Sequence, residues 1–339
     1  MADEAALLDL ARSGDEAAFT AIVTPLRREL HVHCYRMLGS FDDADDALQE
    51  TLLAAWRGLG SFERRSSART WLYRIATNTC LNLLRAAARR PAQALRLPGY
   101  PEPNAHAETT WLQPYPDALL DELPADAPGP LELAERFDSV SLAFTAAIQA
   151  LTPRARAVLV MRDVLGFSAA ETAAMLESTQ DAVAMTLSRA RAAMRDARPP
   201  AQARPARAEE SARLAQAFAA ALAERDIDTV VRLLADDVRF SMPPVPAVWQ
   251  GRERAAAFLS HVAFQVPEAL FVPVGANRQP ALAVYARDAA SEAWRANGVL
   301  VITTRAAGGG GEITAVTRFD ASRMRAFGLP GILAGLAWR

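Results

Sequence analysis

The sequence predicts a multidomain protein with two all-α domains followed by an α+β domain that contains a curved antiparallel sheet. The chain has 339 residues, 51% of them hydrophobic, which is more than one core commonly encloses. Apolar residues recur at helical spacing through most of residues 1–196, whereas the last third indicates helices followed by strands. Two proline-rich stretches separate these parts, which favours separate domains.

The composition argues against several classes of protein. The formal net charge is −2, so the chain as a whole is not a polycation that would bind nucleic acid or a membrane. No uncharged apolar run approaches the roughly 18–20 residues that span a bilayer, and the acidic, amphipathic N-terminus is unlike a signal peptide. Cys34 and Cys80 are too few for a disulfide framework. We therefore expect a reduced, cytoplasmic protein without a membrane partner.

The charge is unevenly distributed. Residues 1–61 hold 5 arginines and 11 acids, residues 62–90 hold 7 arginines and one acid, and residues 91–140 hold 2 arginines and 9 acids. A strongly basic block between two acidic ones predicts local docking of a polyanion. A solvated helix face is the alternative explanation of the basic block.

Helices are expected throughout the first 90 residues. Gly39 is a plausible C-cap for the second helix, and the acids that follow Asp42 suit the N-terminus of the next one. Pro91 ends the last helix because proline cannot continue the hydrogen-bond pattern. The expected helices cover residues 3–12, 15–38, 42–56 and 70–90.

A helix-turn-helix is expected between residues 153 and 196. Ser168 and Glu171 have the spacing of a capping box at the start of a short helix. A tight turn at residues 177–179 separates it from a longer, arginine-rich helix. The core-facing positions of the longer helix are Val183, Leu187 and Ala190. Helical hairpins in unrelated bundles share this pattern, so DNA binding does not follow from it alone.

The last third predicts an α+β domain with a cone-like cavity. A strand and loop follow the first two helices, another helix comes next, and a run of strands completes the domain. The glycines at 308–311 suit a hairpin loop between the last two strands. The expected helices cover residues 209–224, 226–235 and 251–264, and the later strands cover residues 269–276, 280–287, 298–305 and 312–320.

Three segments resemble a known family. HCYRMLGSFDDADDALQETLLAAW and SFERRSSARTWLYRIATNTCLNLLR, within residues 33–85, resemble region 2 of the sigma-70 family. LTPRARAVLVMRDVLGFSAAETAAMLESTQDAVAMTLSRARAAM, at residues 151–194, resembles region 4. The nearest class is the extracytoplasmic-function (ECF) sigma factors. The linker motif WLQPYPDALLDE and the last third resemble a subgroup of that class with a C-terminal SnoaL-like (NTF2-like) domain.

The resemblance implies a domain organisation. Region 2 is a helical bundle, region 4 contains the helix-turn-helix, and an acidic, proline-rich linker joins them. The implied boundaries are residues 1–90 for region 2, 91–131 for the acidic linker, 132–198 for region 4, 199–208 for a second linker, 209–330 for the SnoaL-like domain and 331–339 for a C-terminal tail.

The resemblance also implies the partners. A sigma factor binds core RNA polymerase, through the β and β′ subunits, reads the −35 and −10 promoter elements and melts DNA. The implied polymerase-binding residues are Asp45, Asp46, Leu48, Gln49, Thr51, Leu52 and Trp56. The implied −10 residues are Arg64, Arg65, Ser66, Ser67, Arg69, Thr70, Trp71, Arg74 and Asn78. The implied −35 residues are Thr179, Gln180, Asp181, Ala184, Met185, Ser188, Arg189 and Arg191.

Some of these assignments have structural alternatives. Trp56 suits a polymerase contact or the core of region 2, and Trp71 suits a flipped base or a core anchor. Ala184 and Met185 stand where recognition helices of this class usually carry polar residues. Direct base readout would then depend on Gln180, Ser188 and Arg189, so we expect weak −35 binding by region 4 alone.

The acidic linker suggests a further hypothesis. In sigma factors this linker passes through the polymerase active-site cleft and RNA exit channel, surfaces that bind a polyanion. An acidic peptide could occupy them as an RNA mimic. Neutralising the linker acids should then weaken initiation while leaving −35 binding unchanged; these acids are Asp117, Asp121, Glu122 and Asp126.

We expect the SnoaL-like domain to be regulatory, through a small ligand or an intramolecular contact. Its candidate pocket residues are Phe240, Trp249, His261, Phe264 and Tyr285. Cyclase or isomerase chemistry would need an acid beside His261, for which the candidates are Asp237, Asp288 and Asp320. The alternatives are such an enzyme, or a one-component regulator that senses a ligand. The latter leaves residues 33–85 unexplained.

We expect no cofactor and no catalytic residue. His31, His33 and Cys34 lie within one helical turn and cannot all point at one ion. Two of them at i and i+3 could, but the sequence offers no fourth ligand. We therefore expect no metal.

Overall fold

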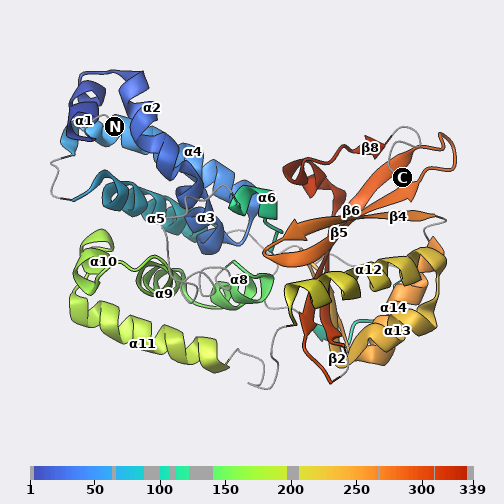
Figure 1. The fold of residues 1–339 in the computed structure, drawn as a ribbon. Helices are drawn as coiled ribbons and strands as arrows, with labels where there is room; N and C mark the ends of the chain where they lie inside the picture. The colour runs from blue at the N-terminus through green and yellow to red at the C-terminus, as the bar shows by residue number, and fades with distance from the viewer. Residues whose placement is uncertain are drawn as a thin grey trace. The chain divides into compact units, whose positions relative to one another are not determined.

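The computed structural model describes residues 4–62, 66–87, 100–106, 111–121, 140–196, 206–265, 268–308 and 310–333 (Figure 1). The chain divides into two compact units. The first comprises residues 1–92 and 119–198, and the second comprises residues 93–118 and 199–339. No helix in the described residues is long and apolar enough to cross a membrane.

The N-terminal part of the first unit is a helical bundle around α3, whose last nine residues are all buried. Pro25 lies in the 3-10 turn η1, because proline lacks the backbone N–H that a continuous helix needs. The single helix expected over residues 15–38 is therefore wrong. The Gly39 C-cap is confirmed, with φ of +74°. The elements are α1 (Glu4–Arg12), α2 (Glu16–Val23), η1 (Thr24–Leu26), α3 (Arg27–Leu38), α4 (Phe41–Gly58), η2 (Leu59–Ser61) and α5 (Ala68–Ala87).

The C-terminal part of the first unit contains the predicted helix-turn-helix. Ser168 accepts a hydrogen bond from the Glu171 amide at 3.2 Å, and the Glu171 carboxylate accepts one from the Ser168 amide at 2.8 Å, so the capping box is confirmed. The core-facing positions Val183, Leu187 and Ala190 are buried, as predicted. The elements are α8 (Leu142–Gln149), α9 (Pro153–Leu159), the π-helical turn η3 (Val160–Val164), α10 (Ala169–Met175) and α11 (Gln180–Asp196).

A buried arginine joins the two parts of the first unit. The Arg156 guanidinium donates to the carbonyl oxygens of Ile148 and Gln149 at 2.9 and 2.8 Å and also bonds the Met37 carbonyl. The Gln149 side chain donates to the Arg36 carbonyl at 3.2 Å. Burial lowers the pKa of Arg156 to about 10. These contacts fix α8 and α9 against the C-terminal turn of α3.

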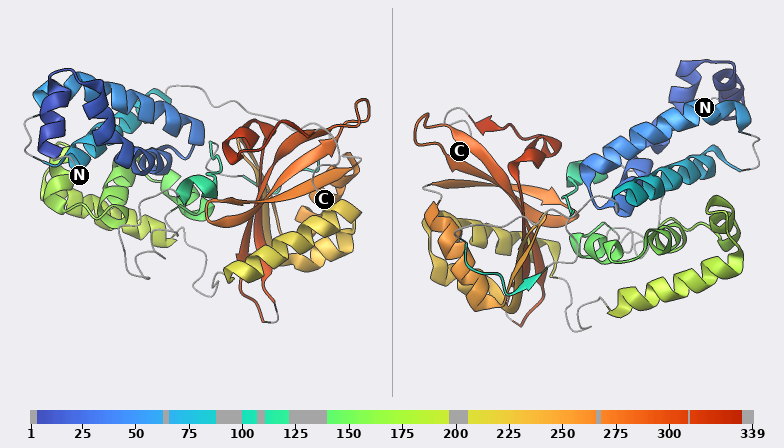
Figure 2. Two further views of the ribbon diagram at one scale, coloured as in Figure 1. Left: turned by 45° about the horizontal axis from the view of Figure 1, so that its top comes forward. Right: turned by 180° about the vertical axis from the view of Figure 1, so that it is seen from behind.

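The second unit is a curved sheet with α12, α13 and α14 on one face (Figures 1 and 2). The strand order is β1-β3-β2-β7-β6-β5-β4, and β8 pairs with β6. The elements are α12 (Ala208–Glu224), α13 (Ile227–Leu233), β2 (Leu234–Met242), β3 (Val245–Gln250), α14 (Arg252–Gln265), β4 (Ala269–Ala276), β5 (Gln279–Arg287), β6 (Trp294–Arg305), β7 (Glu312–Phe319), η4 (Ala321–Phe327) and β8 (Ile332–Leu333).

The sequence predicts an antiparallel sheet, and this prediction is wrong for one pair of strands. Strands β2 and β7 pair in parallel, with Phe240 opposite Val316. The helix α14 separates the β2–β3 hairpin from the β4–β7 meander, and a crossover that contains a helix can bring strands into parallel register. The expected helix at 226–235 also ends early, because β2 begins at Leu234. The hairpin between β6 and β7 is confirmed.

Two pieces of the predicted acidic linker belong to the second unit. Residues 100–106 include β1 (Ala105–His106), which adds to the edge of the sheet beside β3. Residues 111–118 include Asp117 and Ala118, the first two residues of α6 (Asp117–Leu120). Figure 2 shows β1 in green-blue among the yellow and orange elements of the second unit.

Candidate nucleic-acid interface

The predicted polymerase-binding residues lie along α4 but differ in exposure. Leu48 and Thr51 are buried, and the Thr51 hydroxyl donates to the Ala47 carbonyl at 2.6 Å. Leu52 is partly exposed, as is Trp56, which packs edge to face on Phe19. Asp45, Asp46 and Gln49 are exposed. The surface of α4 is therefore acidic at its start and apolar toward its end.

One exposed residue of this surface, Leu53, is not among the predicted polymerase-binding residues. Leu53 is 54% exposed beside Leu52, although it lies outside the helical stripe that includes Leu48 and Leu52. An exposed leucine beside a partly exposed leucine and tryptophan forms an apolar patch. Whether a leucine is exposed depends on how its helix packs in the folded protein, and the spacing of apolar residues does not predict this.

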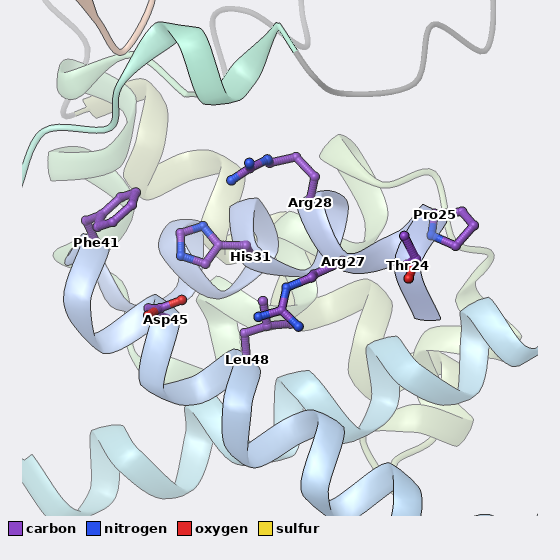
Figure 3. Close-up of a pocket in the computed structure, with 8 residues that line it drawn as sticks. All are labelled: Thr24, Pro25, Arg27, Arg28, His31, Phe41, Asp45 and Leu48. Carbon is purple, nitrogen blue, oxygen red and sulfur yellow. The ribbon is translucent and has the colours of Figure 1, made fainter. Parts of the chain in front are cut away.

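A groove lies between the start of α3 and α4, with a volume of about 370 Å³ (Figure 3). Figure 3 shows His31 between the side chains of Asp45 and Arg28. Burial lowers the pKa of His31 to about 4, and the nearby Asp45 opposes this shift. The groove is lined by Thr24, Pro25, Arg27, Arg28, His31, Phe41, Asp45 and Leu48.

The described −10 residues lie just before α5 and along its first half. Ser66, Ser67, Arg74 and Asn78 are exposed. Trp71 is 6% exposed and stacks on Phe62 with ring centroids 4.7 Å apart, so it is a core anchor in this structure. The Thr70 amide donates to the Ser67 hydroxyl at 3.1 Å at the start of α5. Arg64 and Arg65 lie outside the described residues.

Arg69 is held inside the first unit. Its guanidinium donates to Glu29 Oε2 at 3.1 Å and lies over the rings of Tyr73 and Phe167, with 4.8 and 5.4 Å to the centroids. The Tyr73 hydroxyl donates to the same Glu29 oxygen at 3.1 Å, and burial raises the pKa of Tyr73. A DNA contact by Arg69 would therefore compete with these partners.

The predicted −35 residues share one face of α11 and its preceding turn, and all of them are exposed; they are Thr179, Gln180, Asp181, Ala184, Met185, Ser188, Arg189 and Arg191. Met185 is 57% exposed, whereas methionine is usually buried in folded proteins. Arg191 donates to both carboxylate oxygens of Asp163, at 2.9 and 2.7 Å. These bonds raise the pKa of Arg191 and occupy the guanidinium.

The candidate pocket residues of the second unit lie mostly in its core. Phe240 and Trp249 are buried and pack on Phe258, with centroids 4.5 and 4.0 Å apart. The buried Tyr285 donates its hydroxyl to the Pro330 carbonyl at 2.9 Å. His261 is partly exposed, and the side chain of Phe264 lies outside the described residues.

The acids considered for catalysis have other bonds. Asp288 accepts a hydrogen bond from Arg295, and Asp237 accepts one from Arg305 at 3.0 Å. Asp320 caps η4 and accepts from the Ser322 amide at 2.8 Å. No group of three metal-ligating side chains occurs in the part of the chain that the structure describes.

The second unit holds the linker at two places, which we call the linker clasp: residues 100–106 and residues 115–117. At the first, the Asn104 side chain bonds both the amide and the carbonyl of Gln250, at 2.8 and 2.9 Å. At the second, the Tyr115 amide donates to Asn277 Oδ1, and the Arg278 amide donates to Asp117 at 2.7 Å. The aromatic and apolar composition of WLQPYP is unusual for a solvated linker and is the sequence signal that could have predicted this docking.

Comparison with known proteins identifies the class. Residues 22–90 match the family model for sigma-70 region 2, residues 141–194 match sigma-70 region 4, and residues 215–323 match a SnoaL-like domain. A helical bundle, a helix-turn-helix and an NTF2-like sheet in this order define a sigma-70-family factor with a fused SnoaL-like domain.

Curated relatives narrow the class. The ECF RNA polymerase sigma factor SigG of Mycobacterium tuberculosis is 40% identical over 288 residues, which cover 81% of this chain and 75% of SigG. SigW of Bacillus subtilis is 30% identical over 185 residues, which cover 54% of this chain and 90% of SigW. The chain belongs to the ECF sigma factors. Core RNA polymerase and promoter DNA are the partners of sigma factors.

A solved structure supports the fold. The M. tuberculosis ECF sigma factor SigJ aligns with a TM-score of 0.56 at 21% identity, covering 90% of this chain and 98% of SigJ. The shared fold extends through both the helical parts and the C-terminal sheet.

Proposed function

We propose that α4 carries the polymerase-binding surface, directed at the β and β′ subunits. The exposed Asp45, Asp46 and Gln49 give this surface negative charge, and Leu52, Leu53 and Trp56 give it an apolar patch. A partner with basic and apolar side chains would complement both. The buried Leu48 and Thr51 would act indirectly, by supporting the helix.

The polymerase surface can be tested with matched leucines. Leu53→Asp should weaken binding to core polymerase at least tenfold, measured by fluorescence anisotropy of labelled protein. Leu10→Asp is the control, because Leu10 is 51% exposed and belongs to α1, outside the proposed surface of α4. Equal affinities for the two variants would contradict the assignment of α4.

For the promoter, we propose that the start of α5 handles the −10 strand and that α11 reads the −35 element. The exposed Ser66, Ser67, Arg74 and Asn78 offer polar contacts to an unstacked base and its backbone. On α11, Gln180 and Ser188 offer hydrogen bonds to base edges, and Met185 offers an apolar contact to a thymine methyl group. Initiation, rather than catalysis by the SnoaL-like domain, is the proposed role, and it places the protein in the cytoplasm with RNA polymerase.

The fused domain, in this proposal, limits initiation by holding the linker. The supporting observation is the linker clasp, which holds the linker before WLQPYP, at residues 100–106, and at the end of that motif, at residues 115–117. A linker bound there cannot also follow the RNA path of the polymerase, where its acids would mimic RNA. Release of the clasp would therefore permit initiation.

Run-off transcription with core polymerase tests this role. A chain that ends at residue 205 should give more transcript than the full-length chain at equal concentration. Equal yields would contradict regulation by the domain, and a lower yield would contradict its inhibitory direction. Neutralising Asp121, Glu122 and Asp126 should reduce the transcript and leave −35 binding unchanged, while Asp117 is kept because it belongs to the clasp.

A further inference from the structure

A tyrosine of the linker lies in an aromatic site of the second unit. The Tyr100 ring stacks on Phe258 of α14, with centroids 5.6 Å apart and planes 26° apart, and meets His261 edge to face at 5.3 Å. The carbonyl of Pro101 accepts a hydrogen bond from Trp249 Nε1 at 2.9 Å. Ring stacking together with a hydrogen bond to an acceptor oxygen is how a small aromatic ligand commonly binds in a protein site.

The rings of the site also pack on core residues other than Tyr100. The Phe258 ring centroid lies 4.0 Å from that of Trp249 and 4.5 Å from that of Phe240, and both Phe258 and Trp249 are fully buried in the core of the unit. Tyr100 and Pro101, in contrast, are only partly buried and belong to a segment that contributes just two residues to the sheet. A pairing of two residues is too short to hold a strand by itself. The aromatic contact is therefore a main anchor of this half of the clasp.

A cation lies near the same ring. Arg318 of β7 donates to the carbonyl of Asn297 at 2.9 Å and to its side-chain oxygen at 3.1 Å. Burial lowers the pKa of Arg318, and the nearby Tyr100 and Asp320 oppose this shift. Arg318 therefore adds a charged group to the surroundings of Tyr100.

We propose that Trp249, Phe258 and His261 form a binding site, the aromatic subsite, for a planar phenol-like molecule with a hydrogen-bond acceptor, and that Tyr100 and Pro101 occupy it in cis. A free molecule of this class would compete with Tyr100 and loosen the first half of the clasp. The inference deepens the proposed function and rests on it for the effect on transcription, but not for the binding itself.

The test uses the full-length chain and p-cresol, which is the tyrosine side chain cut at Cβ. In Tyr100→Ala the subsite is vacated, so p-cresol should bind in the millimolar range, measured by saturation-transfer NMR. We expect at least tenfold weaker binding to the wild type, because the tethered ring competes at a high effective concentration. Trp111→Ala is the matched control, because Trp111 is a 65% exposed aromatic residue of the same linker.

A second variant locates the binding. Adding His261→Ala to Tyr100→Ala should weaken p-cresol binding at least fivefold, because it removes the edge contact without touching the buried core. Equal binding to the wild type, Tyr100→Ala and Trp111→Ala would overturn the subsite. Binding gained by Tyr100→Ala, with run-off transcription the same as the wild type, would support the subsite and overturn regulation through this half of the clasp.

Discussion

Tyr115 and Asn277 exchange two hydrogen bonds. The Tyr115 amide donates to Asn277 Oδ1 at 2.9 Å, and the Asn277 amide donates to the Tyr115 carbonyl at 2.9 Å. Both residues are fully buried. Asn277 has φ of +57° and Arg278 has φ of +58°, so a tight turn between β4 and β5 presents its amides to the linker. The turn that closes a hairpin thus also binds the peptide that joins regions 2 and 4.

The first prediction concerns Asn277. Asn277→Gly keeps a residue that tolerates positive φ but removes the acceptor of the Tyr115 amide, which costs about 1 kcal/mol. The Tyr115 amide should then exchange hydrogen roughly fivefold faster, measured by hydrogen–deuterium exchange. Asn104→Ala is the control, because Asn104 holds only the first half of the clasp, so exchange of the Tyr115 amide should match the wild type. Unchanged exchange in Asn277→Gly would contradict the second half of the clasp.

The second prediction concerns Arg156. Arg156→Ala leaves the carbonyls of Ile148, Gln149 and Met37 buried without their donor and should destabilise the first unit by about 2–4 kcal/mol. Urea denaturation followed by circular dichroism measures the loss. Arg154→Ala is the control, because Arg154 makes one bond, to the Leu176 carbonyl at 2.8 Å, and should cost about 1 kcal/mol. A comparable loss in both variants would mean that Arg156 does not join the two helical parts.

Much of this fold follows from local pattern in the sequence. The capping box at Ser168 and the buried face of α11 are set by neighbours within one or two helical turns, so spacing alone predicts them. The parallel pairing of β2 with β7 depends on a crossover that no local pattern specifies. For Trp71, burial against Phe62 is a tertiary contact, and the sequence left it open between a core and a base-contacting role.

The candidate site was harder to predict than the fold. Arg69 was assigned to the −10 element by resemblance, but its contacts with Glu29 and Phe167 join residues 40 and 98 positions apart. The net charge of −2 suggested no nucleic-acid partner for the whole chain, and that inference was wrong, because the charge is segregated by segment. Unequal charge along a chain is more informative than its sum.

The third prediction concerns pH. His33 is fully buried and bonds the Thr77 hydroxyl at 2.9 Å, and burial lowers its pKa from 6.5 to about 3. Below pH 6.5 the unfolded chain binds a proton at this residue that the folded chain does not bind, so stability falls as the pH drops from 6.5 toward 3. The slope is about 1.4 kcal/mol per pH unit in the middle of this window.

A variant pair tests the pH dependence. In His33→Gln the loss of stability between pH 6.5 and pH 5 should shrink by about 1–2 kcal/mol, measured by urea denaturation at each pH. His106→Gln is the control, because His106 is exposed in β1. An unchanged slope in His33→Gln would show that this histidine does not set the acid sensitivity of the first unit.

The fourth prediction separates two arginines of α11 in the holoenzyme. Arg189→Ala should weaken binding to a −35 duplex by about 1–3 kcal/mol and relax the preference at one base pair. Arg191 already forms an ion pair with Asp163, and a phosphate contact would have to replace that pair. Arg191→Ala should therefore weaken DNA binding by less than about 1 kcal/mol, and by the same amount for every DNA sequence. Binding measured across a series of salt concentrations and single-base variants distinguishes these effects, since loss of a phosphate contact lowers the salt slope by about 1. Equal, sequence-independent losses for the two variants would mean that Arg189 contacts only the backbone, and base readout would then depend on Gln180 and Ser188.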